Sequence, residues 1–552
     1  MRMRAGFSFT LFFVLVGCSA YGQSLDGHTT LRIVRDHDAA PPIRFAAGEL
    51  VKYLSQMGNP PPTVLEAPKA GDIYVGMIPA DASSNQRRAI EMAVHDNPDS
   101  FVIRTLGDGL VIYGGSARAD LYGAYHYLET LGVHWYFPGA ANEFVPHGPA
   151  RLQGYDISQS PSFRKRGIVV FSTTPGFNDL VDFAAKMKLN TIGLHAIPFG
   201  PQSTDVGLAD AQRAADPRGL TVDIERHLFG ESYCPDNLVA LGREEKVLTD
   251  YIATLPPSMT DFFLWPADRF LPLCNSPAFR DYSVADLVMS FANQMLATLR
   301  RTRPNARFAF LSYLSTWEPP KHVRPAPGLI LEWAPMFQSF AHSLDDPASG
   351  ANVEYRRDFE ALLRLFGSEN SQVLGYWLDD TLFSRAFYGR LPYTPEALKG
   401  DLTYYHRMGV PAITTFGVIT GRDYFLAHAS PAVFLYPHLL WDVKSDPQEI
   451  MRDFCRNYFG SEQVLEIYER LAEADRLVYV ERQRLRPDDL SNPKFVAAAS
   501  SALKLSGDMV RAELDPVRRA RFARLVQEVA ARFVDPKMLT APREIKVQRQ
   551  LP

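Results

Sequence analysis

Short apolar runs alternate with segments of helical spacing along most of this chain, and the alternation changes character near residue 160. Before that point, residues 26–150 mix the two patterns without regular order, which predicts a small α/β domain. Apolar residues fall on one helical face in 42–56 and 119–131, and the second segment ends at Gly132, a residue typical of helix C-termini. Runs of strand length occur at 31–34, 72–76, 101–104 and 110–113.

The last of these runs leads into Gly114-Gly115-Ser116, directly before the second helix. A glycine-rich turn at a helix N-terminus is one way to bind phosphate, but the GxGxxG spacing is missing here. We therefore interpret these residues as a tight turn.

Eight apolar runs of strand length follow from Arg164 onward, separated by helical or loop segments. Four intervening segments have clear helical spacing: 178–188, 285–301, 355–366 and 395–408. Eight strands, each followed by a crossover, predict a closed (β/α)₈ barrel over 160–440. A doubly wound sheet also explains the alternation, though less naturally at this number of strands. The predicted strands are 167–171, 191–196, 220–226, 261–265, 308–314, 329–333, 373–378 and 412–418.

The two ends of the chain have patterns of their own. Residues 447–536 are strongly helical in spacing and should pack against the barrel, whereas 537–552 are basic and predict a loose tail. Residues 1–23 have the pattern of a signal peptide, with Arg2 and Arg4 before a short apolar stretch. The stretch ends in Leu15-Val16-Gly17-Cys18, which is the pattern of a bacterial lipobox. Ordinary cleavage within 20–23 is the alternative, and both predict an exported protein: a periplasmic, outer-membrane-anchored or secreted one.

Composition and charge indicate which kinds of binding partner can be expected. The formal net charge is −4 and no long basic run occurs, so we expect neither nucleic acid nor an anionic membrane surface as a partner. Contact with a membrane is expected only through a lipid anchor at the N-terminus. Besides Cys18, the chain has only Cys234, Cys274 and Cys455. Cys234 and Cys274 can pair if the fold brings them together, but buried free thiols are the simpler interpretation.

The barrel prediction reduces 62 acidic residues to a few candidates, because catalytic groups in such barrels follow the carboxyl ends of strands. Asp379 and Asp380 follow the seventh strand directly, Glu332 lies in the sixth, and Asp268 follows the fourth. Cleavage of a glycosidic bond needs one carboxyl group to protonate the leaving oxygen. It also needs a second group to attack, to activate water or to orient a substrate acetamido group.

These acids also have structural interpretations, and one geometric objection. Asp379 and Asp380 are able to cap a helix, Glu332 to form a buried ion pair, and Asp268 to begin a loop. Successive strand residues point to opposite faces, so both Asp379 and Asp380 reach one site only if the strand has ended or bulged. Weaker acidic candidates are Asp223, Glu225 and Glu318.

Histidines and aromatic residues accompany the acids at the same strand ends. The histidines are hydrogen-bond partners for a sugar or core residues, since no HxH or HExxH spacing indicates metal, and we expect neither metal nor cofactor. The aromatic residues stack on sugar rings or fill the core. The predicted substrate-binding residues are His195, His227, Trp265, Tyr313, Trp317, Trp333, Tyr376 and Trp377.

Several segments resemble a known group of proteins. Residues 43–54 (IRFAAGELVKYL), 114–116 (GGS), 121–125 (LYGAY) and 131–138 (LGVHWYFP) resemble the small α/β domain that precedes the barrel in β-hexosaminidases and α-glucuronidases. The barrel is similar to the domain-of-unknown-function 4838 group, some of whose members form glycoside hydrolase family 163. That family contains endo-β-N-acetylglucosaminidases acting on N-glycans. The resemblance covers most of residues 30–440 and is more specific in the first domain.

The resemblance implies a retaining, substrate-assisted mechanism without metal, in which the substrate's acetamido group forms an oxazoline. Related hexosaminidase families use adjacent acids at a strand end, which favours Asp379-Asp380. The group often carries a cysteine pair after its fourth barrel strand, whereas here only Cys274 follows Asp268.

Three hypotheses about function follow. The first is an exported β-N-acetylhexosaminidase-like glycosidase that acts on glycans. The second is a uronidase or another glycosidase that needs no acetamido group, for which Arg166, Arg226 or Arg269 would hold a substrate carboxylate. The third is a non-catalytic glycan-binding lipoprotein.

Overall fold

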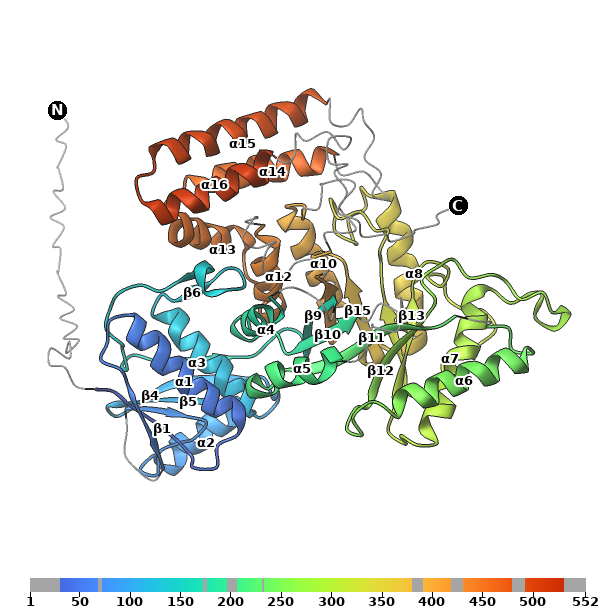
Figure 1. The fold of residues 1–552 in the computed structure, drawn as a ribbon, viewed down its shortest axis with the longest axis horizontal. Helices are drawn as coiled ribbons and strands as arrows, with labels where there is room; N and C mark the ends of the chain where they lie inside the picture. Colours follow the sequence, from blue (N-terminus) through green and yellow to red (C-terminus); the bar gives the residue numbers. More distant parts are fainter. Residues whose placement is uncertain are drawn as a thin grey trace, which may run out of the picture.

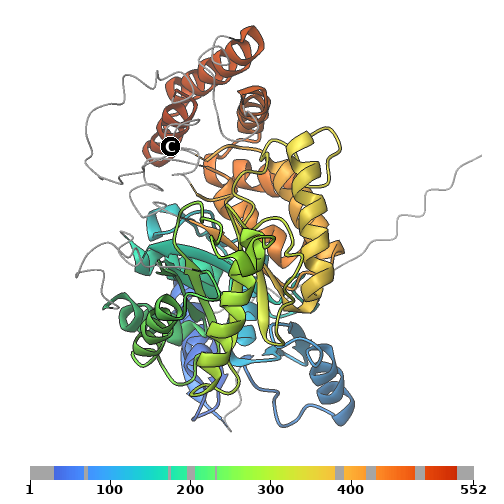
Figure 2. The same cartoon turned by 90° about the vertical axis from the view of Figure 1, so that its right-hand side faces the viewer.

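The computed structural model describes residues 30–67, 72–171, 176–195, 206–230, 233–379, 391–417, 430–478 and 492–530. Within these ranges the chain forms three parts, stacked in the two views of Figures 1 and 2 with the N-terminal domain below the barrel and a group of helices above it. None of the described helices combines the length and the apolar character that crossing a bilayer requires.

The N-terminal domain is a six-stranded sheet with helices on both faces, so the predicted α/β domain is confirmed. Alternate residues of its strands face opposite sides. Phe101, Ile103 and Ile112 pack in the main core with helices α1 (Pro41–Gln56) and α3 (Ala117–Thr130), whereas Val102 and Val111 pack with Ile90 of α2 (Ser84–Ala93). The strand order is β2 (Thr63–Glu66), β1 (Arg32–Arg35), β3 (Ile73–Val75), β5 (Gly109–Gly114), β4 (Phe101–Leu106) and β8 (Asp156–Gln159).

Two details differ from or refine the expectation for this domain. The strand β8 pairs antiparallel with β4, so the sheet continues past residue 150, where the domain was predicted to end. The turn after β5 is tight, because a Cβ at Gly114 would lie 2.6 Å from Ala119 and one at Gly115 would lie 2.8 Å from two backbone carbonyl oxygens. A small hairpin, β6 (His134–Trp135) with β7 (Glu143–Phe144), follows α3.

The predicted barrel is confirmed: eight parallel strands close into a ring in chain order. Most residues of the strands are buried, and most of them are apolar, as is usual for parallel strands under helices; β11 (Thr221–Phe229) is the exception, with polar residues at alternate positions. The strands are β9 (Lys165–Phe171), β10 (Thr191–His195), β11 (Thr221–Phe229), β12 (Asp261–Pro266), β13 (Arg307–Ser312), β14 (Leu329–Trp333), β15 (Ser371–Gly375) and β16 (Ala412–Phe416).

Seven helices of the described residues cover the outside of the barrel, and they include the four that the sequence predicted. They are α4 (Phe177–Lys186), α5 (Val206–Ala215), α6 (Leu238–Ile252), α7 (Val284–Arg300), α8 (Gly350–Phe366), α10 (Pro395–Arg407) and α12 (Ala432–Trp441). The connection from β13 to β14 contains no helix, so the alternation of strand and helix is irregular there. The strand β15 ends at Gly375, three residues before the predicted end, because the chain turns at Tyr376.

The C-terminal region is helical, as predicted, over its described part. It contains α13 (Pro447–Phe454), a π-helical turn (Cys455–Phe459), α14 (Val464–Val478), α15 (Pro493–Ala512) and α16 (Pro516–Ala530), and Figure 1 shows α14 to α16 packed side by side. The predicted signal peptide (1–23) and tail (537–552) lie outside the described residues.

Buried charges fasten the N-terminal domain to the base of the barrel. Arg166, with no exposed surface, donates from Nη2 to Asp99 Oδ2 at 2.8 Å and from Nε to the carbonyl oxygen of Lys188. The same carboxylate accepts a hydrogen bond from Asn190 and pairs with Arg118. Burial alone would raise the pKa of Asp99, but the two guanidinium groups outweigh it and hold the pKa below its usual value.

Candidate active site

Two histidines lie where adjacent barrel strands end. His195 closes β10 and His227 lies near the end of β11, with ring centroids 5.8 Å apart, and both rings contact Trp265 of β12. Each Nδ1 lies against a backbone carbonyl oxygen, that of Glu225 or Pro266. Burial lowers the pKa of both rings, that of His195 to about 4. Each neutral ring therefore donates from Nδ1 and presents Nε2 as an acceptor.

Asp268 comes to the same place from the loop after β12. Its Oδ1 accepts a hydrogen bond from the Tyr313 hydroxyl at 3.1 Å, and Tyr313 follows β13 directly. Tyr313 also lies within ring-contact distance of His227, with centroids 6.4 Å apart. The negative charge of Asp268 acts on both histidines, opposing the burial that lowers the pKa of each.

The turn after β15 brings Tyr376 to the same end of the barrel. Tyr376 stacks at 5.4 Å on Phe416 of β16, and Phe416 in turn contacts Trp265 and His195. Burial raises the pKa of the Tyr376 phenol well above its usual value, reinforced by the nearby Tyr313 and by the charges of Asp379 and Asp268. Asp268 and Asp379 follow the carboxyl ends of β12 and β15, and these ends lie on the same side of a parallel barrel.

Asp379 is 7% exposed, and its backbone N–H donates to the carbonyl oxygen of Tyr376. Because β15 has already ended at Gly375, strand alternation no longer keeps Asp379 and Asp380 on opposite faces. Asp380 itself lies outside the described residues.

Glu332 lies deeper in the barrel than these residues. Its two carboxyl oxygens accept hydrogen bonds from Trp265 Nε1 at 2.6 Å and from Gln372 Nε2 at 2.9 Å, and it has no exposed surface. Gln372 in turn accepts from Lys165, the first residue of β9, whose Nζ also lies 2.7 Å from Asp223. Glu332 is therefore positioned between the Trp265 ring and the base of the barrel. Burial raises its pKa to about 7, although the Trp265 hydrogen bond and Lys165 oppose this.

Glu225 is a second buried carboxyl group in the same interior. It lies against Gly193, where a Cβ would come within 2.8 Å of Oε1, and neither of its oxygens has a hydrogen-bond partner among the residues that the structure describes. Burial and the neighbouring charge of Glu332 raise the pKa of Glu225 well above its usual value. We call Lys165, Asp223, Glu225, Glu332 and Gln372 the interior network.

The sequence did not single out Lys165 and Gln372. The signal was present, since each is a polar residue at an inward-facing position of an otherwise apolar strand. It is weak by itself, because the partners come from strands about 200 residues apart in the chain.

Three of the predicted substrate-binding tryptophans pack against other side chains. Trp333 points outward from β14 and packs on Tyr355 and Phe359 of α8, with no exposed surface. Trp377 donates from Nε1 to the buried Asp401 of α10. Trp317 packs against Phe337 and Tyr355. Glu318 beside it is exposed, and its charge contributes to raising the pKa of Arg357. Of the predicted sugar-stacking tryptophans, Trp265 is the one whose ring contacts both His195 and His227.

The three arginines considered for a substrate carboxylate are also separated. Arg166 is committed to Asp99 at the domain boundary, and Arg226 lies over the ring of Tyr251 on α6, outside the barrel. Arg269 follows Asp268 directly, is exposed, and donates from Nη2 to the carbonyl oxygen of Gly230. Only Arg269 therefore lies beside the candidate acids.

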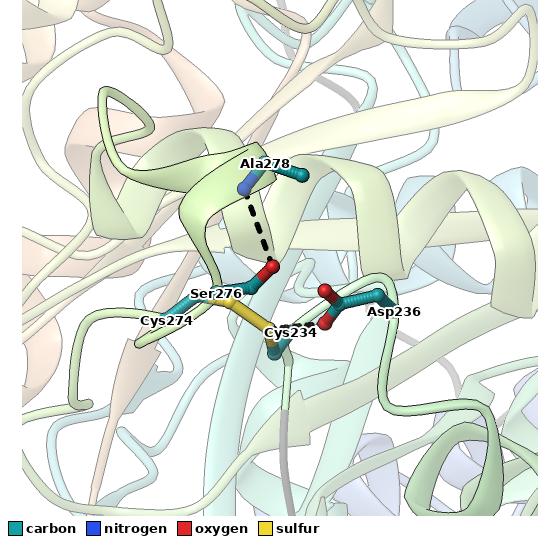
Figure 3. Close-up of a disulfide and its surroundings, with 5 residues drawn as sticks. All are labelled: Cys234, Asp236, Cys274, Ser276 and Ala278. Atoms are coloured by element: carbon teal, nitrogen blue, oxygen red, sulfur yellow. Dashed lines mark hydrogen bonds between the residues drawn. A yellow bond between two sulfur atoms is a disulfide. The ribbon is translucent and has the colours of Figure 1, made fainter.

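Cys234 and Cys274 form a disulfide, so the interpretation as free thiols is wrong for this pair. Figure 3 shows the bond joining the segment of Cys234 and Asp236 to that of Cys274 and Ser276. The spacing of 40 residues hid the pairing, which depends on the loops after β11 and β12 lying side by side. Cys455 is a buried free thiol, as predicted.

Potential metal ligands gather at one place in the described part of the chain: Cys234, Asp236 and Cys274 lie within 4.8 Å of one another. Because both sulfur atoms are bonded to each other, neither is available as a thiolate ligand. This group therefore does not fit a metal site in its oxidised form.

The end of the barrel thus combines acidic groups with neutral donors and acceptors. We call Asp268, Asp379, His195, His227, Tyr313 and Tyr376 the mouth group, with Trp265 and Phe416 beneath it. Carboxylates that protonate or attack, hydroxyl donors and imidazole acceptors are the groups that sugar chemistry uses.

Comparison with known proteins agrees with this architecture. Residues 270–468 match the family model described as "Domain of unknown function (DUF4838)", which supports the resemblance over the second half of the barrel. No curated protein sequence matches the chain.

Two solved structures share the fold at low sequence identity. A family GH115 4-O-methyl-α-glucuronidase with specificity for decorated arabinogalactans has a TM-score of 0.61 at 14% identity, covering 91% of this chain and 71% of its own. A GH138 enzyme targeting pectin rhamnogalacturonan II has a TM-score of 0.54 at 10% identity, covering 91% of this chain and 85% of its own. The N-terminal domain and barrel therefore form an architecture that is also found in glycoside hydrolases.

Proposed function

We propose that this protein is an exported glycoside hydrolase whose catalytic carboxylates are Asp379, Asp380 and Asp268. The observation that carries the proposal is that Asp268, which is hydrogen-bonded to Tyr313, and Asp379 both follow the carboxyl ends of strands of a closed parallel barrel. The glycosidase names of the two structures with the same fold support it.

The proposed substrate is a β-N-acetylhexosaminide of the GlcNAc type, cleaved with the help of its own acetamido group. Such a mechanism needs an acceptor for the amide N–H and a donor for the amide oxygen. The Asp268 carboxylate and the Tyr313 hydroxyl, whose oxygens are 3.1 Å apart, supply both kinds of group. The fully buried Glu332 acts indirectly, by holding Trp265 in place.

A uronide is the second candidate substrate. Arg269 beside Asp268 supports it, since a guanidinium group binds a carboxylate in a bidentate way. The glucuronidase name of one similar structure also favours it.

The test is hydrolysis of a panel of aryl glycosides and one N-glycoprotein by the purified protein. Asp379→Asn, Asp380→Asn and Asp268→Asn should each remain folded and lose at least about 100-fold in kcat/KM, because the lost group acts on the reacting bond. Glu318→Gln is the matched control, since Glu318 lies in the loop after β13 but is exposed beside Arg357. Turnover of GlcNAc-type substrates with inhibition by a thiazoline supports the first substrate, whereas turnover of uronides alone supports the second.

Wild-type activity in all three carboxamide variants would contradict the site assignment. If wild-type protein has no turnover on any substrate but binds glycans on an array, the third hypothesis, a non-catalytic glycan-binding lipoprotein, replaces the enzyme.

Export is part of the proposal. The signal-like residues 1–23 motivate it, and the Cys234–Cys274 disulfide supports it, because such bonds persist in oxidising compartments. Mass spectrometry of the mature N-terminus tests it: a lipid on Cys18 is expected in the native protein and should be absent from Cys18→Ala. A chain that retains its first residues in the cytoplasm would contradict export.

A further inference from the structure

The loop that carries Asp268 is fastened at both of its ends. We call residues 267–274 the mouth loop. Its first residue, Ala267, donates its N–H to the Tyr233 hydroxyl at 3.1 Å, and Arg269 donates to the Gly230 carbonyl oxygen at 2.9 Å. Its last residue, Cys274, is bonded to Cys234 (Figure 3). The mouth loop is thus tied to the loop after β11 along its length.

A further bond holds the middle of the mouth loop. The N–H of Leu271 donates to Ser315 Oγ at 3.0 Å, in the connection after β13. Asp268 in turn accepts from Tyr313 of the same connection. The mouth loop therefore lies across the ends of three successive strands, β11, β12 and β13, with its backbone held in place.

This fastened loop nevertheless presents apolar side chains to solvent. Phe270 is 56% exposed and Leu273 is 61% exposed. On the other side of the disulfide, Leu238 and Val239 at the start of α6 are 74% and 68% exposed. Four of the ten large apolar side chains that the described residues leave exposed thus flank the Cys234–Cys274 bond in the sequence.

Phe270 is the only aromatic side chain among those ten, and it follows Asp268 by two residues. An aromatic side chain binds the apolar face of a sugar ring. Because the backbone of the mouth loop is already held in place, little conformational entropy of the loop is lost when a ligand binds. Because Asp268 and Phe270 share the mouth loop, a glycan that binds at Asp268 has the exposed Phe270 only two residues away along the chain. A sugar ring is therefore a fitting occupant for an exposed aromatic group at this position.

We propose that Phe270, flanked by Leu273, forms a distal sugar-binding subsite for the part of an extended glycan that lies outside the bond to be cleaved. The proposal rests on the proposed function, because it places the glycan at the mouth group. The disulfide and the bonds of Ala267, Arg269 and Leu271 hold the subsite in position.

The activity test compares an extended oligosaccharide with a short aryl glycoside of the same sugar. Phe270→Ala should lower kcat/KM on the oligosaccharide by about 3- to 10-fold, the range expected for loss of one aromatic contact, and leave the aryl glycoside unchanged. Phe270→Trp should restore most of the loss. Met92→Ala is the control, since Met92 is 64% exposed on α2 of the N-terminal domain, and it should change neither substrate. Equal losses on both substrates, or no loss on either, would overturn the subsite.

A binding test separates this proposal from the proposed function. Asp379→Asn and the double variant Asp379→Asn/Phe270→Ala are applied to the same glycan array, and the affinity for the tightest ligand is then measured in solution. Weaker binding by the double variant supports the subsite even if the wild-type protein shows no hydrolysis. Equal affinity, or no glycan bound by either protein, overturns it, as would loss of self-association in Phe270→Ala without any effect on glycans.

Discussion

Glu332→Gln is the most informative single change in the barrel interior. The carboxyl group of Glu332 is fully buried and accepts hydrogen bonds from Trp265 and Gln372. Burial raises its pKa from 4.5 to about 7. The folded protein therefore binds a proton there more tightly than the unfolded chain does, and folding becomes less favourable as the pH rises from 4.5 toward 7.

The magnitude follows from these two values. A pKa of about 7 in place of 4.5 corresponds to a pH-dependent cost of roughly 3 kcal/mol above both values, most of which appears between pH 5 and pH 8. Glutamine does not ionise and avoids this cost. Its amide keeps one acceptor oxygen, so either Trp265 or Gln372 loses its acceptor, which costs about 1–3 kcal/mol at every pH.

Glu332→Gln should therefore be less stable than wild type by about 1–3 kcal/mol at pH 5, and the difference should shrink by roughly 2 kcal/mol at pH 8.

Urea unfolding of both proteins at several pH values between 5 and 8 measures the effect, with the disulfide kept intact. Trp265→Phe is the matched variant: it removes the N–H that favours the charged carboxylate, so the pH-dependent loss should move to higher pH. A stability difference between Glu332→Gln and wild type that is the same at pH 5 and pH 8 would mean that Glu332 ionises normally when buried, and the reasoning would fail.

Two further predictions concern the parts that hold the site in place. Asp99→Asn should cost about 3–5 kcal/mol of stability, because it leaves the buried Arg166 without its charge partner; thermal unfolding measures this, and a Tm close to wild type would contradict it. Wild-type protein should also lose stability as the pH falls below the ordinary pKa of a carboxyl group toward the depressed pKa of Asp99, whereas the variant lacks this group and should not show that loss. Reduction of Cys234–Cys274, which closes a loop of about 40 residues, should cost up to about 4 kcal/mol, and an unchanged Tm in reductant would show that the bond does not stabilise the fold.

The eight barrel strands were predictable because most of them are runs of mainly apolar residues, separated at regular intervals by helical or loop segments. Their ends were less predictable. The residues after Gly375 are as apolar as the strand, yet the chain turns at Tyr376, and only the hydrogen bond from Asp379 to Tyr376 reveals it. The same shift removes the geometric objection to Asp379 and Asp380 acting together.

Side-chain direction was the main source of misplaced site residues. Strand alternation alone separates Glu332 from Trp333, since neighbours in a strand face opposite sides, so an inward Glu332 requires an outward Trp333. Trp377 could not be placed in this way, because it follows the strand and its direction depends on Asp401 of α10. The interior network and the disulfide each join distant segments, and no local pattern encodes such contacts.

The structure divides the barrel into two regions with different tasks. Below Trp265 lies the interior network, in which Lys165 pairs with Asp223 and Gln372 bonds both Lys165 and Glu332, whereas the oxygens of Glu225 have no partner among the described residues. Burial raises the pKa of both Glu225 and Glu332. Above Trp265 lie the mouth group and the mouth loop, which come from segments after the strands. Substitutions in the interior network should therefore change the pH dependence of stability and activity. Substitutions at Asp268 or Arg269 should instead change which sugar is accepted, because the proposed function places the sugar at the bond to be cleaved against those residues.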